Sequence, residues 1–176
     1  VPSRAADQVM QAVPEIPSRF AAMIAGRRLS PISMYVAVTE RCPYRCEHCS
    51  ATGRQPVADC DGSELKALLH ALQEMGTAII GLTGGEPLLR DDLCDVIASL
   101  DDRSVSILFT SGYGLTRERA QALKRAGLFA AGISLDSDEA AEMDSRRGHA
   151  GAFEQATQAV RFCRDAGIYT MTQTVA

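Results

Sequence analysis

The sequence predicts an α/β fold: a partial barrel of parallel strands with outer helices, truncated after the fifth strand. Two observations predict it. From residue 31 onward, short apolar segments alternate with longer amphipathic ones through short connections, which indicates parallel strands joined by helices. The apolar segments lack regular polar alternation, as is typical of strands buried on both faces. Five such units are too few to close an eight-unit barrel.

Each predicted element has a local signal. The first helix of the repeating pattern has apolar residues at helical spacing and a glycine at its end. Its predicted inner face is Leu65, Leu68, Leu69, Leu72 and Met75, and Gly76 is the predicted cap. The predicted strands are 32–38, 77–83, 104–110, 129–135 and 168–175. The predicted helices are 63–75, 91–100, 116–126 and 151–166.

The chain divides into two regions at about residue 30. Residues 1–30 are expected to form an N-terminal helical extension, which Pro14 and Pro17 break into one or two short helices. Residues 31–176 are expected to form the partial barrel. Because the first residue is Val1 rather than methionine, we expect the chain to be trimmed.

Composition argues against several classes of function. The chain has 18 basic and 22 acidic residues and no basic stripe, so we expect no nucleic acid partner. No apolar run is long enough to span a bilayer, so we expect no membrane partner. The N-terminus does not resemble a signal peptide. Six cysteines without an export signal indicate reduced thiols and a cytoplasmic location.

Three cysteines follow the first predicted strand closely. Cys42, Cys46 and Cys49 form a C-x3-C-x2-C run. Structural zinc usually takes four ligands, and the remaining candidate on the loop, His48, is adjacent to Cys49. A disulfide would leave one thiol over. A 4Fe–4S cluster bound by three thiolates would keep one iron open for another ligand. The residues alone leave these alternatives open, with the cluster favoured.

Polar groups and glycines also follow the other strands. Gly84 and Gly85 after the second strand are either a flexible turn or a place where a ligand approaches bare backbone, and Glu86 offers a carboxylate to an ammonium group. After the fourth strand, Arg147 could bind a carboxylate or pair on the surface with Asp138 or Glu142. Arg146 is a competing candidate.

Together these motifs resemble the radical S-adenosylmethionine (radical SAM) enzyme superfamily. The matching stretches are the C-x3-C-x2-C run, T-G-G-E-P at 83–87, and S-L-D at 134–136 with R-G at 147–148. The resemblance implies that the three cysteines bind a 4Fe–4S cluster whose fourth iron is chelated by S-adenosylmethionine. In that family the reduced cluster cleaves this cofactor to a 5′-deoxyadenosyl radical, which abstracts hydrogen from a substrate.

The resemblance also assigns the residues that bind the cofactor. It implies that Thr83, Gly84, Gly85 and Glu86 hold the methionine amino group. The family's barrel usually has six units, so the resemblance implies that the C-terminal part of the domain lies outside this chain.

Four further roles follow from the same resemblance. Ser134 is implied to contact the cofactor and Arg147 to bind its carboxylate. Gln173 is implied to reach the ribose hydroxyls, or else to be an amide satisfied by nearby backbone. His48 would lie near the adenine, a variant similar to the subgroup with SPASM or twitch C-terminal extensions. Ser111 stands where related sequences often have asparagine, and a role there is open.

Partners and substrate are less specified. The resemblance implies an electron donor such as flavodoxin or ferredoxin. Two substrate classes fit the motifs: a ribosomally synthesised peptide, which we favour, and a small cofactor or tetrapyrrole precursor. A hypothesis of another class is a non-catalytic iron–sulfur or zinc protein, which would leave T-G-G-E-P unexplained.

Overall fold

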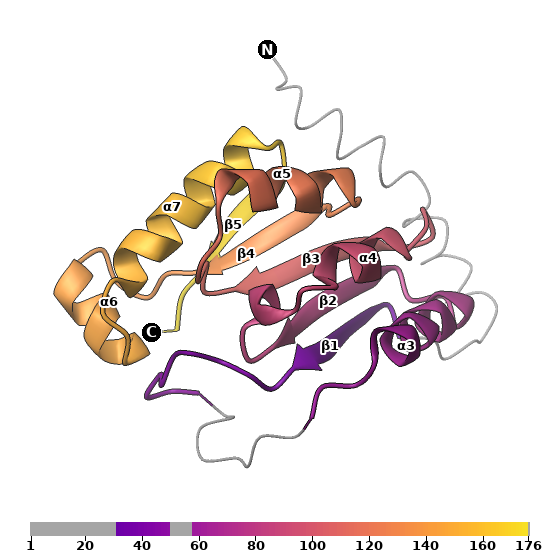
Figure 1. The fold of residues 1–176 in the computed structure, drawn as a ribbon, viewed down its shortest axis with the longest axis horizontal. Coiled ribbons are helices and arrows are strands. Elements are labelled where there is room, and N and C mark those ends of the chain that lie inside the picture. Colours follow the sequence, from indigo (N-terminus) through magenta and orange to yellow (C-terminus); the bar gives the residue numbers. More distant parts are fainter. Residues whose placement is uncertain (1–30, 50–57, 176) are drawn as a thin grey trace.

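The computed structural model describes residues 31–49 and 58–175. The predicted N-terminal helices at 1–30 lie outside the described residues, so the boundary between the two regions remains a prediction. The described residues form one parallel sheet with helices, as the sequence predicts (Figure 1).

The sheet has five parallel strands in the order in which they occur along the chain. They are β1 (Ser33–Thr39), β2 (Ile79–Gly84), β3 (Val105–Thr110), β4 (Ala130–Ser134) and β5 (Tyr169–Gln173). Since all run in one direction, their carboxyl ends lie at the same edge of the sheet. This confirms the predicted partial barrel of parallel strands.

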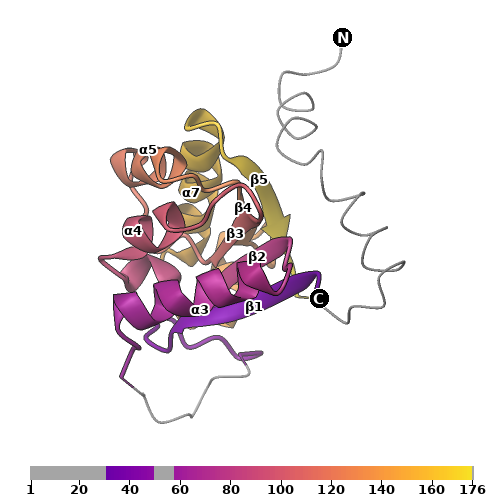
Figure 2. The ribbon, with the colours of Figure 1, turned by 90° about the vertical axis from the view of Figure 1, so that its right-hand side faces the viewer.

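The helices that connect the strands cover one side of the sheet, as Figure 2 shows. They are α3 (Gly62–Glu74), α4 (Leu93–Ala98), α5 (Arg117–Arg125) and α7 (Ala152–Asp165). Asp61 and Glu64 form a capping box at the start of α3, and the Thr116 side chain accepts a hydrogen bond from the Arg119 amide at the start of α5. Each such cap stabilises a helix by about 1 kcal/mol.

Two short elements were not predicted. The 3₁₀ turn η1 (Pro87–Leu89) follows β2, and α6 (Ala140–Arg147) lies between β4 and α7. The sequence predicts no helix between residues 135 and 151. Met143 is the one completely buried apolar side chain of α6, so the helix lacks the apolar stripe that periodicity detects.

The core lies between the sheet and the helices. Strand residues that face the helices are buried, among them Val38, Ile80, Leu82, Leu108 and Ile133. From α3 the buried leucines are Leu65, Leu69 and Leu72. Side chains on the opposite side of the sheet are more accessible: Tyr35 is 64% exposed and Tyr169 is 51% exposed. The strands are therefore not all buried on both faces as expected.

The predicted inner face of α3 was also too wide. Leu68 and Met75 are 47% and 53% exposed, whereas Leu65, Leu69 and Leu72 contact the core. A helix resting on a sheet buries a narrow stripe, and the positions flanking this stripe turn toward solvent.

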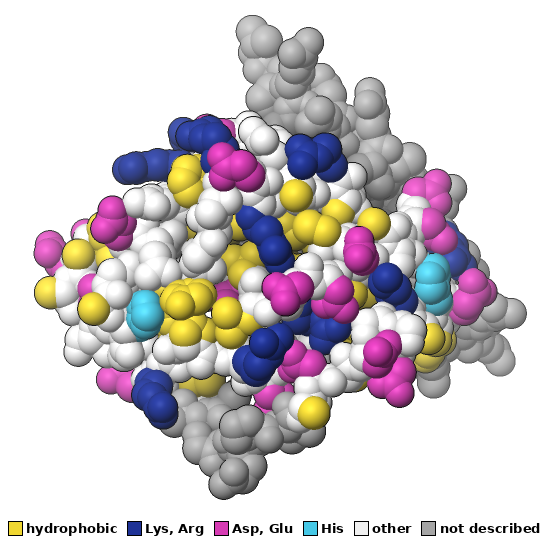
Figure 3. Space-filling model, in the orientation of Figure 1, with side chains coloured by type: hydrophobic (Ala, Val, Ile, Leu, Met, Phe, Trp, Pro, Cys, Tyr) yellow, Lys and Arg dark blue, Asp and Glu magenta, His cyan; other side chains and the backbone are white. Residues whose placement is uncertain are grey.

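The surface carries mixed charge. On the face shown in Figure 3, basic and acidic side chains are interspersed, with hydrophobic side chains between them. Within residues 31–49 and 58–175, none of the helices combines the length and the apolar character that crossing a bilayer requires.

Candidate functional site

The segments that the sequence predicts to be functional lie at the carboxyl edge of the sheet. The cysteine loop (residues 42–49) follows β1, the Gly84–Glu86 turn ends β2, Ser111 follows β3, and Asp136 follows β4. In open sheets of parallel strands, ligands bind at this edge.

The cysteine loop is anchored to the end of α6. The amide of Arg45 donates a hydrogen bond to the carbonyl of Arg147 (3.1 Å), and the amide of Glu47 donates to the carbonyl of Arg146 (3.1 Å). Gly148, in the left-handed conformation, ends the helix, and a Cβ there would lie 2.6 Å from the Arg45 carbonyl oxygen. The unpredicted helix therefore holds the predicted loop.

The three thiols have different environments. Cys42 and Cys49 are exposed, and Cys46 is buried. Burial raises the pKa of the Cys42 and Cys46 thiols, and the charges of neighbouring cysteines raise both further. Within the described chain, no three His, Cys, Asp or Glu side chains form a group that could hold a metal ion. A cubane cluster places each thiolate on a different iron, so it needs ligands spread wider than a single zinc ion does.

Arg147 is buried and paired at this site. Its Nη2 lies 2.7 Å from Asp136 Oδ2, and its Nη1 donates to Cys46 Sγ at 3.8 Å. The alternative of a surface ion pair between Arg147 and Asp138 or Glu142 is wrong, because Arg147 is buried against Asp136. Glu142 pairs with Arg146 instead (3.2 Å). Among the two adjacent arginines, Arg147 is therefore the one directed at the cysteine loop.

The two glycines after β2 permit close approach of the chain to itself. A Cβ on Gly84 would lie 2.2 Å from the carbonyl oxygen of Thr39, and one on Gly85 would lie 2.2 Å from that of Arg41. The amides of Gly85 and Glu86 donate to these same carbonyls, at 2.7 and 2.8 Å. The glycines thus dock the start of the cysteine loop onto the turn.

Glu86 is a buried carboxylate, 1% exposed. It accepts hydrogen bonds from the Leu88 amide (3.0 Å), the Ser111 amide (2.8 Å), and the hydroxyls of Thr110 and Ser111. Burial raises the pKa of Glu86, and these hydrogen bonds offset only part of the effect. No ion pair within the described residues joins Glu86 to a Lys or Arg side chain, so a bound cation would stabilise this carboxylate.

The other expected ligand-binding residues lie around the same edge. Thr83 and Ser134 are partly buried at the ends of β2 and β4. His48 lies on the cysteine loop with its Nε2 3.9 Å from Asp136 Oδ2. Gln173 is exposed at the end of β5, paired in register with Ser134, and its carbonyl accepts from the Leu135 amide (2.8 Å).

The structure contains an aromatic cluster at the cysteine loop that the sequence did not predict as part of the site. The Tyr44 and His149 rings stack with centroids 4.4 Å apart, and Tyr113 contacts both rings edge-on. Burial raises the pKa of Tyr44 to about 12. Tyr44, inside the C-x3-C-x2-C run, was the sequence signal for this cluster. Its partners Tyr113 and His149 follow β3 and β4, and no spacing in the sequence links them to Tyr44.

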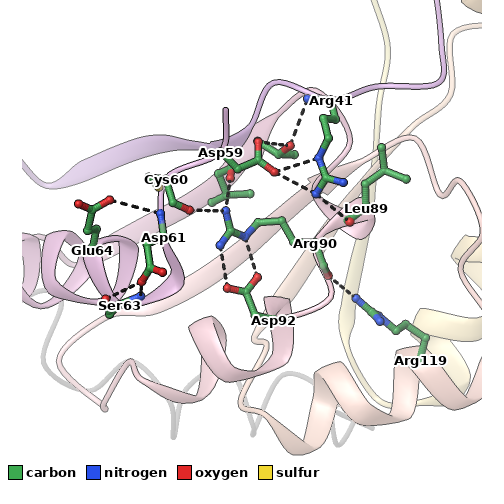
Figure 4. A network of polar contacts seen from close by, with 12 residues as sticks. Arg41, Asp59, Cys60, Asp61, Ser63, Glu64, Leu89, Arg90, Asp92 and Arg119 are labelled. Carbon is green, nitrogen blue, oxygen red and sulfur yellow. Dashed lines mark hydrogen bonds and ion pairs between the residues drawn. The ribbon is translucent and has the colours of Figure 1, made fainter. Parts of the chain in front are cut away.

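A polar network joins the end of β1, before the cysteine loop, to residues 59–60 (Figure 4). Asp59, which follows the loop, accepts from the Thr39 hydroxyl (2.7 Å) and from Arg41 Nε (2.9 Å), which precede it. Arg90 donates to the carbonyls of Val38 (2.9 Å) and Cys60 (3.2 Å).

The buried Arg90 is itself held by a second carboxylate. Its guanidinium binds both oxygens of Asp92, at 2.8 and 2.7 Å, and its carbonyl accepts from Arg119 (2.7 Å). Three arginines, Arg41, Arg90 and Arg119, therefore connect four segments, as the sticks in Figure 4 show. These segments are residues 38–41, residues 59–60, the η1 turn and α5.

Comparison with known proteins agrees with this geometry. Residues 36–176 match the family model described as the radical SAM superfamily. The AdoMet-dependent heme synthase of Nitratidesulfovibrio vulgaris is 36% identical over 144 residues, which cover 79% of this chain and 39% of that protein. The PqqA peptide cyclase of Methylocella silvestris is 33% identical over 145 residues, covering 80% of this chain and 38% of that protein.

The fold of this chain is also similar to that of a solved structure. Streptococcus suis SuiB bound to S-adenosylmethionine superposes with a TM-score of 0.74 at 12% identity, over 90% of this chain and 37% of SuiB. This chain thus spans less than half the length of the relatives that it matches. The family uses a 4Fe–4S cluster and S-adenosylmethionine, and its members need a reductant and a substrate. On the match of residues 36–176, the chain belongs to the radical SAM superfamily.

Proposed function

We propose that Cys42, Cys46 and Cys49 bind a 4Fe–4S cluster, and that the chain positions S-adenosylmethionine for reductive cleavage to a 5′-deoxyadenosyl radical. One observation carries the proposal: a loop with three thiols meets a buried carboxylate and a buried guanidinium at one edge of the sheet. A loop with these donors suits a cubane, and the two opposite charges suit the ammonium and carboxylate of an amino acid.

The chain's own residues would bind the two ends of that amino acid. Glu86 would receive the ammonium group, which supplies the cation that its buried carboxylate lacks within the described chain. The backbone of Thr83, Gly84 and Gly85 would approach the same group. Arg147 would bind the carboxylate, since its guanidinium carries more donors than its bond to Asp136 uses.

The remainder of the cofactor would lie along the sheet edge. Ser134 and Gln173, which are paired in register, would contact the methionine and ribose portions. His48 would lie beside the adenine. The cluster, held by Cys42, Cys46 and Cys49, would supply the electron for cleavage of the sulfonium. The protein would orient the cofactor and exclude water, because a primary carbon radical reacts with most nearby C–H bonds.

Partners follow from the same chemistry. A one-electron donor such as flavodoxin or ferredoxin would reduce the cluster. We propose a cytoplasmic location, because thiols that bind a cluster require a reducing compartment. The His48 variant supports placing this chain with the subgroup whose members have a SPASM or twitch extension.

For the substrate we propose a ribosomally synthesised peptide, in line with the similarity to a PqqA peptide cyclase. A tetrapyrrole is the second candidate, supported by the similarity to an AdoMet-dependent heme synthase. The accessible side of the sheet carries neighbouring Tyr35 and Phe109 rings, 5.4 Å apart, which would suit a planar macrocycle. Equilibrium binding of an iron porphyrin, measured against a Tyr35→Ala variant, separates the two candidates.

Anaerobic reconstitution tests the central proposal. Addition of dithionite and S-adenosylmethionine should yield 5′-deoxyadenosine, and Cys46→Ala should abolish both the cluster absorbance and this product. A non-catalytic iron–sulfur or zinc protein would instead bind its metal without responding to S-adenosylmethionine. That result would overturn the proposed function.

A further inference from the structure

A buried ion pair lies beside the middle cysteine of the loop. Arg147 Nη2 is 2.7 Å from Asp136 Oδ2, and the two side chains are 9% and 0% exposed. On its other branch, Arg147 Nη1 donates a hydrogen bond to Cys46 Sγ at 3.8 Å. The positive group thus lies between the sulfur and the carboxylate.

The geometry of this pair is fixed from several directions. Asp136 Oδ1 accepts from the Val175 amide (3.0 Å), and His48 Nε2 approaches Asp136 Oδ2 at 3.9 Å. The carbonyl of Arg147 accepts from the Arg45 amide (3.1 Å). Backbone groups therefore hold the carboxylate of Asp136 and the main chain of Arg147 in place.

A fixed charge in a buried position acts strongly on its neighbours, because the effective dielectric constant is lower than in water. The guanidinium of Arg147 donates to Cys46 Sγ at 3.8 Å, so its positive charge stabilises negative charge on this sulfur. The carboxylate of Asp136, on the other side of the guanidinium, opposes that effect.

We propose that Arg147 and Asp136 set the reduction potential of the cluster bound through Cys46, with Arg147 raising it and Asp136 lowering it. Reduction adds one electron to the cluster and its thiolates, so a donor and positive charge at a ligating sulfur favour the reduced form. The two residues act through Cys46 as positioning residues. This inference rests on the proposed function only in requiring that the cluster binds.

The role is separate from binding the cofactor's carboxylate. It requires no S-adenosylmethionine, so the potential is measured in its absence. The reductant is a one-electron donor, for which dithionite serves in the titration.

The test is a redox titration of the anaerobically reconstituted chain, followed by electron paramagnetic resonance of the reduced cluster. Arg147→Gln should lower the midpoint potential by about 59 mV. For a one-electron couple, this shift reduces the ratio of reduced to oxidised cluster about tenfold at a fixed applied potential. Arg147→Lys, which keeps the charge, should retain most of the wild-type potential. Asp136→Asn should raise the potential, and the double variant should lie between the single ones.

Arg146→Gln is the matched control. Arg146 is adjacent to Arg147, and its carbonyl also holds the cysteine loop. Its side chain pairs with Glu142 and donates to the Val175 carbonyl instead of to Asp136, so the potential of this variant should equal that of the wild type. For each variant, circular dichroism reports whether the chain is folded, and iron content reports how much cluster is bound. These two measurements distinguish a loss of folding or of cluster from a change in the reduction potential.

Shifts of opposite sign for Arg147→Gln and Asp136→Asn support the inference. If the pair only holds the loop, both variants would lose iron while the remaining clusters kept the wild-type potential. That outcome would overturn the inference and leave the proposed function standing. A wild-type chain that assembles no cluster would overturn both.

Discussion

The amide of Arg45 donates a hydrogen bond to the carbonyl of Arg147, and this bond joins the cysteine loop to the end of α6. It brings together two segments that lie on opposite sides of the GGE turn in sequence. Because the loop follows the first strand and the helix follows the fourth, the geometry of the thiols depends on correct assembly of the whole sheet.

Gly148→Ala should weaken this junction. A Cβ at residue 148 would lie 2.6 Å from the Arg45 carbonyl oxygen, so the loop must shift, and iron retained after reconstitution should fall. Gly114→Ala is the control, because Gly114 has a similar φ (63° against 57°) but nothing within 4 Å of a Cβ. Both variants have the left-handed strain of about 1–2 kcal/mol. Equal iron content in the two variants would contradict the proposed anchoring.

Asp59→Asn should loosen the base of the loop. The change removes the ion pair with Arg41 (2.9 Å) and should destabilise the fold by about 1 kcal/mol, with lower iron content. Asp101→Asn is the control, since Asp101 also pairs with an arginine, Arg103, but follows α4 far from the thiols. It should lower stability without changing iron content.

The same aspartate predicts a dependence on pH. Burial acts to raise the pKa of Asp59, but hydrogen bonds from Thr39 and Arg41 outweigh it, so the pKa is lowered. A lowered pKa contributes stability above the unfolded value of about 3.9, and this contribution is lost as the pH falls. Between about pH 5 and pH 3, melting temperature should therefore fall less steeply in Asp59→Asn than in the wild type. Parallel curves would contradict this assignment.

Glu86→Gln should lower both stability and binding. Burial raises the pKa of Glu86, so its contribution to stability is present below the unfolded pKa of about 4.3 and is lost as the pH rises through the raised folded value. Both carboxylate oxygens accept hydrogen bonds from backbone amides, those of Leu88 and Ser111, so the amide nitrogen of Gln would face one of these donors and the melting temperature should fall. Affinity for S-adenosylmethionine, measured calorimetrically, should fall about tenfold, or by about 1.4 kcal/mol. Unchanged affinity would remove Glu86 from the cofactor site.

Tyr44→Phe should remove an alkaline transition. Burial raises the pKa of Tyr44 to about 12, so this residue contributes stability that is complete below about pH 10 and is lost as the pH rises toward 12. Ultraviolet titration of tyrosinate should show one late-ionising group that is missing in Tyr44→Phe. Tyr169→Phe, at an exposed position on β5, should leave this late transition in place.

The strands and most helices could be predicted because their signals are local. Strands β1 to β4 are short, mainly apolar runs, and Leu65, Leu69 and Leu72 repeat at the spacing of a helix. The motif residues could be placed at one edge because parallel strands bring their carboxyl ends together. Helix α6 escaped prediction because Met143 is its one completely buried apolar residue, and four of its other seven residues are charged.

Pairings across the sheet could not be predicted. The sequence suggested Asp138 or Glu142 as surface partners of Arg147 only as the alternative to binding a carboxylate ligand, and the fold places Asp136 against it. Similarly, no local pattern indicated that Gly84 and Gly85 approach the chain's own Thr39 and Arg41 carbonyls. Both depend on distances between strands, which local patterns do not encode.

The long separation between Cys46 and Arg147, 101 residues along the chain, has a consequence for biosynthesis. The ribosome releases the thiols first, and at roughly 5–20 residues per second the helix that restrains them emerges about 5–20 s later. During that interval the nascent loop has no partner in α6. Insertion of iron and sulfide by a delivery system would therefore be productive only after translation has passed residue 148.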